Sequence, residues 1–521
     1  MKTRGLRPDL LTVFSAMIFP LCGTAALAQT PDPVVRTASG KLSGTSADNV
    51  SSFKGIPYAA APTGANRWRA PQRVVPWKGV RAAGRFGPIC QQKYQPKDNG
   101  VGPLPMSEDC LTLNVFAPSG AKNAPVMFWI HGGGYVNGSG TAALYDGAAL
   151  ARQGVVVVTI NYRLGRFGFF AHPALTADAG QGDVANYGLM DMVAALKWVR
   201  NNIRQFGGDP KKVTIFGESA GGAAVNALMV SPRARGLFIR AAVQSGLGRE
   251  RTLSLAEAEK AGEEFAATVG LKGASTAQLR SLSPEAILVA GEPQIFAGGG
   301  PIIDGKFLKR SSMAAFRRGE QASIPYLIGW NSLEFPVPAT SLSSANPVSS
   351  AIPADLISQA KAAYADADAF NINFFSDVLF IEPGVELAKL HAATRKPVFV
   401  YQFSVVPKSA QAIFKGAVHA SDREFVFNNL NASSFPTDAN DAKQARTISG
   451  YWVNFAKTGN PNDNIRPAWQ PFTMDRSLVM NLTNDGPKLE SVPRQAAIEA
   501  ISSFQNGHDL DAIAPLRTDQ P

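Results

Sequence analysis

The segment Val213-Thr-Ile-Phe-Gly-Glu-Ser-Ala-Gly-Gly222 decides the fold of this chain. Its apolar, β-type start predicts a buried strand, and the small residues after it predict a sharp turn into a helix. The turn imposes a strained backbone on its apex, Ser219, so the positions two residues to either side must be glycine-sized. Gly217 and Gly221 meet that need. The pattern is typical of a nucleophile elbow, which raises a serine hydroxyl above a sheet at a helix N-terminus, where N–H groups favour negative charge.

A second motif lies upstream of the first. Val126-Met-Phe-Trp-Ile130 predicts a buried strand, and His131-Gly-Gly-Gly-Tyr135 follows it directly. An acyl-transfer enzyme needs two or three N–H donors aimed at the oxygen of its tetrahedral intermediate, and glycines let the backbone approach that oxygen closely. A glycine triplet alone more often marks a flexible loop. Its place after a strand and before the elbow favours an oxyanion hole.

Further motifs occur along nearly the whole chain: Phe53-Lys-Gly-Ile-Pro-Tyr58, Glu108-Asp-Cys-Leu-Thr-Leu-Asn114, Asn161-Tyr-Arg-Leu-Gly-Arg-Phe-Gly168, Asn186-Tyr-Gly-Leu-Met-Asp191, Phe206-Gly-Gly-Asp-Pro210, Gln244-Ser-Gly246 and Asn454-Phe-Ala-Lys-Thr-Gly-Asn-Pro461. With these motifs in this order, the chain resembles the type-B carboxylesterases, which include the cholinesterases and bacterial para-nitrobenzyl esterases. The resemblance implies an α/β-hydrolase fold, a mostly parallel central sheet flanked by helices.

The hydrophobic pattern agrees with that fold class. It predicts strands at 111–116, 126–130, 155–161, 213–218, 240–245, 326–330, 398–403 and 478–482, and helices at 186–205, 219–230, 254–269, 355–365 and 442–457. Alternation of strand and helix over the middle of the chain indicates a parallel sheet. A Pro/Ser/Ala-rich loop at 335–352 and helical insertions around 250–300 and 355–395 are expected to roof the active site.

Ser219 needs a general base, and the chain has five histidines. His419, within Gly416-Ala-Val-His-Ala-Ser-Asp-Arg-Glu-Phe-Val-Phe427, matches the family's catalytic-histidine segment. His131 precedes the serine, which is the wrong chain order for this fold. We expect surface or capping roles for the other histidines: His131, His172, His391 and His508.

The third catalytic residue should be an acid between the serine and the histidine in sequence. Glu334 follows the predicted strand at 326–330, where the family places its glutamate, usually within Asp-Glu-Gly. Here the local sequence is Leu333-Glu334-Phe335, so both neighbours depart from that pattern. The poorer alternatives are Asp366, Asp368 and Glu382.

These assignments imply a serine esterase with a two-step mechanism. Ser219 attacks an ester carbonyl, and the N–H groups of Gly133, Gly134 and Ala220 are expected to hold the oxyanion. Water then hydrolyses the acyl-enzyme. An inactive adhesion or scaffold protein of the same fold is the competing class, but such relatives lose members of the triad. A peptidase or amidase on the same triad is chemically possible as well.

The resemblance also implies supporting residues. Ser245 matches a family serine that hydrogen-bonds near the catalytic acid. Two internal ion pairs are expected, and they join Arg67 to Glu108 and Arg163 to Asp191.

The N-terminus predicts a secretory signal peptide. Basic residues precede an apolar stretch, Leu10–Ala28, that ends in Ala-Leu-Ala. Cleavage after Ala28 would leave a single carboxylesterase domain, 29–521, in the periplasm or outside the cell. An uncleaved anchor is the alternative, because the stretch is about long enough to span a bilayer.

Two cysteines would remain after cleavage, Cys90 and Cys110. In an oxidising compartment this spacing indicates one disulfide, and the family closes its first loop with a bridge at the Glu-Asp-Cys motif. Tyr94 is the single aromatic residue in this loop, and it contains no tryptophan. Cholinesterases bind choline on a tryptophan there, so we expect a neutral ester as substrate.

Other classes of ligand are not indicated. The sequence has no zinc-type Cys/His grouping, phosphate-binding lysine loop or dinucleotide fingerprint, so no metal or cofactor is expected. The net charge of +11 comes from Lys and Arg scattered among acidic residues, which favours a solvated surface over a nucleic-acid site. The expected partners are a small-molecule ester and water, with no stable membrane insertion after signal cleavage.

Overall fold

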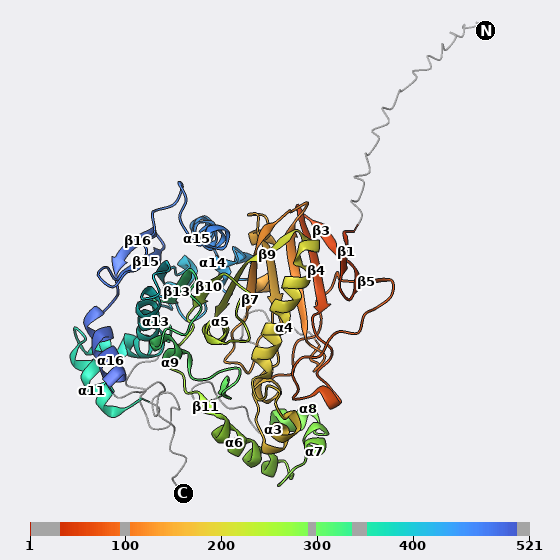
Figure 1. Cartoon of the computed structure of the whole chain (residues 1–521). Coiled ribbons are helices and arrows are strands. Elements are labelled where there is room, and N and C mark those ends of the chain that lie inside the picture. The colour runs from red at the N-terminus through yellow and green to blue at the C-terminus, as the bar shows by residue number, and fades with distance from the viewer. Residues whose placement is uncertain (2–31, 94–104, 290–298, 336–351, 508–521) are drawn as a thin grey trace.

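The computed structural model describes residues 1, 32–93, 105–289, 299–335 and 352–507. The predicted signal peptide, most of the predicted loop at 335–352 and residues 94–104 of the disulfide loop lie outside these ranges. Within the described residues, an eleven-stranded sheet forms the centre of the molecule, with helices on both sides (Figure 1). Its spatial order is β16-β15-β14-β13-β10-β9-β7-β8-β6-β4-β3.

The strands of this sheet are β3 (Thr45–Ala47), β4 (Val50–Pro57), β6 (Thr112–Pro118), β7 (Ala124–Ile130), β8 (Val156–Ile160), β9 (Gly208–Glu218), β10 (Arg240–Gln244), β13 (Tyr326–Asn331), β14 (Val398–Phe403), β15 (Leu478–Thr483) and β16 (Gly486–Ser491). The run from β8 through β7, β9, β10, β13 and β14 to β15 is parallel, and the outer strands pair antiparallel. Two smaller sheets comprise β1 (Val34–Thr37), β2 (Gly40–Ser43) and β5 (Val80–Ala82), and β11 (Leu253–Ser254) and β12 (Ile302–Ile303).

The α-helices are α1 (Ala148–Ala151), α2 (Gly165–Gly168), α3 (Pro173–Ala179), α4 (Tyr187–Asn202), α5 (Ala220–Val230), α6 (Leu255–Thr268), α7 (Thr276–Arg280), α8 (Pro284–Val289), α9 (Ser312–Arg317), α11 (Ala354–Ala362), α12 (Ala367–Ser376), α13 (Glu382–Ala392), α14 (Arg423–Val426), α15 (Ala439–Thr458) and α16 (Gln495–Gly507). A π-helical segment, η6 (Asp377–Ile381), joins α12 to α13. No helix in the described ranges is both long and apolar enough to cross a membrane.

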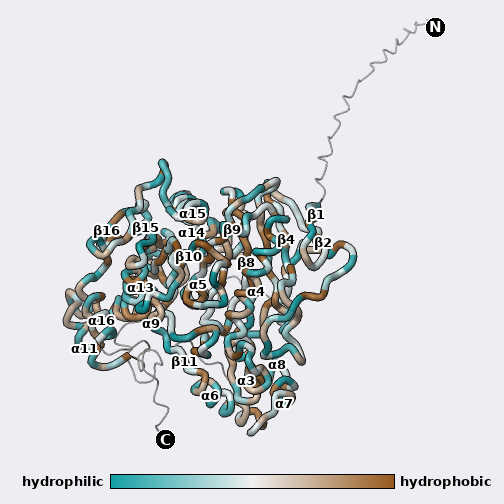
Figure 2. Tube along the Cα trace, viewed as in Figure 1, coloured by the Kyte–Doolittle hydropathy of each residue, from teal (hydrophilic) through white to brown (hydrophobic). Residues whose placement is uncertain are grey.

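The core lies on both faces of the sheet, because successive side chains of a strand point to opposite faces. In β7, Val126, Phe128 and Ile130 belong to one buried cluster, together with residues of α4, α5 and α13. Met127 and Trp129 belong to a second cluster, together with residues of α14 and α15. A strand buried on both faces has a continuous apolar sequence, which is why apolar and polar residues do not alternate in β7. Figure 2 shows hydrophobic residues concentrated along the central strands and α5.

The predicted strands and helices are all present, with shifts at their ends. The largest shift is in β9, which begins at Gly208 rather than at residue 213. The sequence interpretation missed β4, where every third residue is buried rather than every second. A register shift between Phe53 and Ile56 explains this spacing, because it interrupts the alternation that identifies a strand.

The parallel strands bring the functional motifs to one edge. Parallel strands end at the same side of a sheet, and ligand sites in such folds lie at their carboxyl ends. The glycine motif follows β7, Ser219 follows β9, Ser245 follows β10 and Glu334 lies just after β13.

Candidate active site

Ser219 has the strained backbone that the elbow requires. Its φ is 54° and its ψ is −125°, between the end of β9 and the start of α5. A Cβ atom added to Gly221 would lie 2.1 Å from the carbonyl oxygen of Ile130, and one added to Gly217 would lie 2.5 Å from that of Gly221. Real Cβ atoms do not approach the backbone so closely, so no larger residue fits at either position. The predicted strand, turn and helix are confirmed.

His419 connects Ser219 to Glu334. Its Nε2 lies 2.9 Å from the Ser219 hydroxyl oxygen, and its Nδ1 lies 2.6 Å from Glu334 Oε2. The backbone N–H of His419 also donates to the carbonyl oxygen of Glu334, at 2.9 Å. The structure therefore brings the three predicted residues together in the order serine, histidine, acid.

Glu334 is held in place by its second carboxylate oxygen. The hydroxyl of Ser245 donates to Oε1 at 2.6 Å, and the backbone N–H of Asn331 donates to the same oxygen at 2.7 Å. The Glu334 side chain is buried. The position expected for Ser245 beside the acid is confirmed.

The alternative acids are engaged elsewhere. Asp366 caps α12 by accepting the N–H of Ala369, and Asp368 lies in the first turn of that helix. Glu382 accepts two hydrogen bonds from Arg249. None of these contacts involves His419.

Among the other described histidines, His172 has the expected capping role, but a surface role was wrong for His131 and His391, which are buried. His131 stacks on Tyr162, and burial lowers the pKa of His131 to about 4. His172 caps α3, and His391 Nε2 lies 2.8 Å from the carbonyl oxygen of Ile324. His508 lies outside the described residues.

The glycine motif lies against the nucleophile. The sheet register pairs Ile130 with Gly217, so the loop after β7 and the elbow after β9 lie side by side. A Cβ atom added to Gly132 would lie 3.0 Å from the Cβ of Ser219. Gly133 and Gly134 follow with φ values of 102° and 60°, which glycine adopts without strain. Ala220, the residue directly after Ser219, is the first residue of α5, so its N–H lies at the N-terminus of that helix.

The sequence interpretation overlooked Glu218. Its Oε1 lies 3.4 Å from His419 Nε2, and its Oε2 lies 3.9 Å from Nη1 of Arg423. Burial raises the pKa of Glu218 to about 7, although Arg423 and His419 both act to lower it. The residue stands immediately before Ser219, and a charged residue at the end of the mainly apolar run 213–217 was the available signal.

The neighbouring carboxylates raise the pKa of His419. Burial acts to lower the pKa of His419, but the charge and hydrogen bond of Glu334, with the charge of Glu218, outweigh it and raise that pKa. Asp422 is buried nearby and accepts hydrogen bonds from Gln244 and Tyr401. Burial raises the pKa of Asp422 too.

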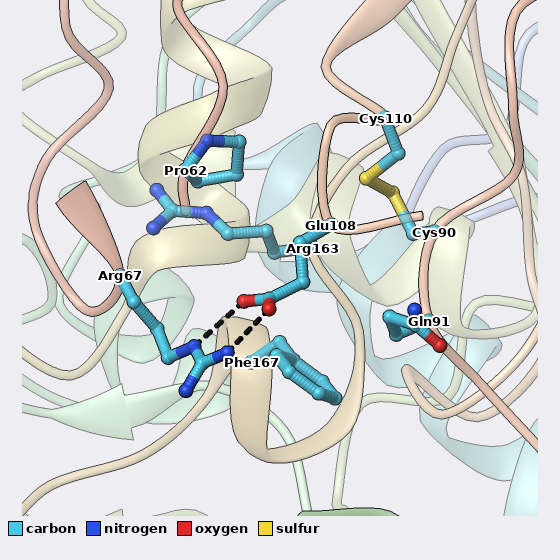
Figure 3. Close-up of a pocket in the computed structure, with 8 residues that line it drawn as sticks. All are labelled: Pro62, Arg67, Cys90, Gln91, Glu108, Cys110, Arg163 and Phe167. Carbon is cyan, nitrogen blue, oxygen red and sulfur yellow. Dashed lines mark hydrogen bonds and ion pairs between the residues drawn. A yellow bond between two sulfur atoms is a disulfide. The ribbon is translucent and has the colours of Figure 1, made fainter. Parts of the chain in front are cut away.

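Both predicted ion pairs are present. Arg67 donates to Glu108 from Nε at 2.7 Å and also from Nη2, beside the Cys90–Cys110 disulfide (Figure 3).

The second pair is more deeply buried. Arg163 donates from Nη2 to Asp191 at 2.7 Å, and both side chains are almost fully enclosed. Burial raises the pKa of Asp191, against the charge of Arg163. Removing one partner of a buried pair costs about 3–5 kcal/mol, so these residues support the architecture.

The described residues contain no group of three or more His, Cys, Asp or Glu side chains that could hold a metal ion. The chemistry that the arrangement supports is nucleophilic attack by an activated serine hydroxyl.

Comparison with known proteins gives the same result. The sequence model of the carboxylesterase family matches residues 31–352 and 354–500. The fumonisin B1 esterase of Sphingopyxis macrogoltabida is 38% identical over 490 residues, covering 88% of this chain and 88% of that protein. The para-nitrobenzyl esterase of Bacillus subtilis (strain 168) is 38% identical over 453 residues, covering 82% of this chain and 90% of that protein.

Solved structures show the same fold. A para-nitrobenzyl esterase structure has a TM-score of 0.78 at 33% identity, and the match covers 90% of this chain and 99% of that one. A thermophilic para-nitrobenzyl esterase has a TM-score of 0.80 at 32% identity, with the same coverage. The predicted α/β-hydrolase fold is confirmed. The chain belongs to the carboxylesterase family and is a carboxylic-ester hydrolase.

Proposed function

We propose that this protein hydrolyses neutral carboxylic esters through an acyl-enzyme on Ser219. The observation that carries the proposal is the continuous hydrogen-bonded series from the Ser219 hydroxyl through His419 to Glu334. A serine hydroxyl is a weak nucleophile unless an oriented base removes its proton. Here Nε2 of His419 is in position to do so, and Glu334 fixes the ring by binding Nδ1.

The first half-reaction forms the acyl-enzyme. Ser219 Oγ bonds to the ester carbonyl carbon while its proton passes to Nε2 of His419. The carbonyl oxygen becomes an oxyanion beside the N–H groups of Gly133, Gly134 and Ala220. The bond from carbon to the alcohol oxygen then breaks, and His419 returns the proton to the leaving alcohol.

The second half-reaction repeats these steps with water. His419 accepts a proton from water as the water oxygen bonds to the acyl carbon. The bond to Ser219 Oγ breaks, Oγ recovers the proton, and the carboxylic acid is released. The imidazolium that forms in each step lies next to Glu334 and Glu218, whose charges favour it.

The chemistry of the disulfide loop supports a neutral substrate. The loop between Cys90 and Cys110 has two lysines and three acidic residues, and two of those acids belong to the Glu-Asp-Cys motif. Glu108, one of these two, is paired with Arg67. The names of the two relatives, a fumonisin B1 esterase and a para-nitrobenzyl esterase, are consistent with ester hydrolysis.

We also propose that residues 1–28 form a signal peptide and that residues 29–521 act as one domain in the periplasm or outside the cell. The Cys90–Cys110 disulfide supports this location, because such bonds persist in oxidising compartments.

Substitution of the nucleophile tests the function. Ser219→Ala should lower kcat by about six orders of magnitude, and an organophosphonate should label wild type once, at Ser219. Ser254→Ala, which removes the half-buried hydroxyl that caps α6, is the control and should retain full activity. Label at another serine, or activity retained in Ser219→Ala, would refute the proposal. Matched ester and amide substrates distinguish an esterase from an amidase on the same triad.

A further inference from the structure

Two phenylalanine rings pack on His419. The ring of Phe335 is stacked on the imidazole, with centroids 5.3 Å apart and planes inclined by 21°. The ring of Phe380 lies 4.9 Å from the imidazole centroid at 47°. Phe335 and Phe380 also contact each other at 5.5 Å. The three rings therefore form one mutually contacting group.

The position of Phe335 is fixed by its neighbour in the chain and by a hydrogen bond to α12. It directly follows Glu334, which binds Nδ1 of His419. Its own backbone N–H donates to the Ser376 hydroxyl, which ends α12, at 3.3 Å. Phe335 is thus tied both to the acid and to the helix that leads into η6.

Phe380 is held by an anchored helical segment. It belongs to η6, a π-helical turn, and such turns widen a helix and occur frequently at functional sites. Asp377, the first residue of η6, is fully buried and accepts two hydrogen bonds from Arg494 and one from Tyr364. Phe380 itself is 3% exposed. The segment therefore presents its ring to His419 from a fixed position.

The contacts of the imidazole fall into two kinds. The hydrogen bonds to Ser219 and Glu334 run from its ring nitrogens, so they act at the edge of the ring. The ring of Phe335 is stacked on the face of the imidazole, and the ring of Phe380 contacts the imidazole at a tilt. The face of a phenylalanine ring carries negative potential and attracts a cation within about 6 Å. The neutral imidazole gains less from this contact than the imidazolium does.

We propose that Phe335 and Phe380 are positioning residues that form a contiguous aromatic pair against His419, holding the ring plane and stabilising the imidazolium formed at each proton transfer. The role of this aromatic pair rests on the proposed role of His419 as general base. It also accounts for Phe335 as the residue after the catalytic acid, where the sequence departs from the family pattern.

The substitutions used in the test must leave the charged groups near His419 unchanged. These groups are Glu334, Glu218, Asp422 and Arg423, whose charges act on the pKa of His419 or of the carboxylates beside it. Substitution of a phenylalanine alters none of these groups directly. Leucine at either position keeps apolar cover over the imidazole and removes the aromatic ring.

The experiment compares Phe335→Leu and Phe380→Leu with wild type. In each variant the midpoint of the kcat/KM profile should move to lower pH by about half a unit, and kcat should fall about two- to fivefold. Phe335→Tyr keeps the ring and should restore both values. Phe370→Leu is the matched control: its ring contacts Tyr364 and Phe374 rather than His419, and the profile should not change.

A second readout does not require turnover. Histidine labelled with ¹³C is incorporated in a Ser219→Ala background and followed by NMR. The resonance that is absent from the spectrum of His419→Gln belongs to His419, and its shift with pH reports the titration of that residue directly. Its midpoint should fall in both leucine variants. A midpoint that stays constant or rises in both would overturn the proposed role of the aromatic pair, since the apolar contact that leucine also provides would then account for the packing. Retained hydrolysis in Ser219→Ala would instead refute the proposed function and leave this titration interpretable.

Discussion

The carboxylate of Glu218 lies 3.4 Å from Nε2 of His419, the same ring nitrogen that contacts the Ser219 hydroxyl at 2.9 Å. The imidazole thus has an acid at each end, since Glu334 binds Nδ1. A proton taken from Ser219 creates a cation between two carboxyl groups. Both groups act to raise the pKa of His419, so the pH dependence of the enzyme reports on them.

The pH profile should follow the deprotonation of His419. A general base works in its neutral form, so activity is lost below its pKa and present above it. Because the pKa of His419 is raised, the rise in kcat/KM should have its midpoint above the usual histidine value. The measurement is kcat/KM for one neutral ester from about pH 5 to 9. A flat profile over this range would exclude histidine as the base.

Glu218→Gln should move that midpoint to lower pH. Glutamine keeps the size of the side chain and removes the negative charge that favours the imidazolium. The burial that raises the pKa of Glu218 to about 7 means that this charge is present mainly above neutral pH. The same pH series on the variant provides the measurement. An unchanged midpoint would show that Glu218 does not act on His419 electrostatically.

Glu334→Gln should lower kcat by roughly 10³- to 10⁴-fold with the fold retained, because glutamine orients the wrong imidazole tautomer. Asp366→Asn is the control, since Asp366 caps α12 and should not affect turnover. Circular dichroism verifies folding of both variants. Near-wild-type turnover in Glu334→Gln would assign the acid role to another residue.

The Cys90–Cys110 bridge should contribute to stability. It closes a loop of 20 residues, which the chain-entropy account values at about 3 kcal/mol before any strain is subtracted. Urea unfolding of the double Cys→Ser variant against wild type measures the difference. Peptide mapping without reductant should recover the crosslink from exported protein, and two free thiols there would contradict the proposed oxidising location.

Choline esters should not be preferred over neutral ones. A quaternary ammonium is bound well by the face of a tryptophan, and the disulfide loop has none. The specificity constants for acetylcholine and its uncharged 3,3-dimethylbutyl isostere should be similar. A strong preference for the charged ester would reveal a cation site elsewhere in the protein.

The sequence by itself determined the parts of this protein that depend on local geometry. Gly217 and Gly221 are dictated by the turn at Ser219, and the apolar run at 213–216 identifies the strand that leads into it. The same holds for the glycine motif after β7. These features are readable because each restriction acts within a few residues of the chain.

The resemblance predicted Ser219 and Glu334 as the partners of His419, but only the tertiary structure decided which further side chains contact its ring. Ser219 and His419 are 200 residues apart, and the sheet brings them to one edge. The sequence marks Glu218 and Phe335 as neighbours of catalytic residues, but not as contacts of the imidazole. Their contacts depend on how the ends of β9 and β13 and the segment η6 are placed around His419. Burial there also sets the pKa of Glu218, because desolvation depends on every chain segment that excludes water from the carboxylate.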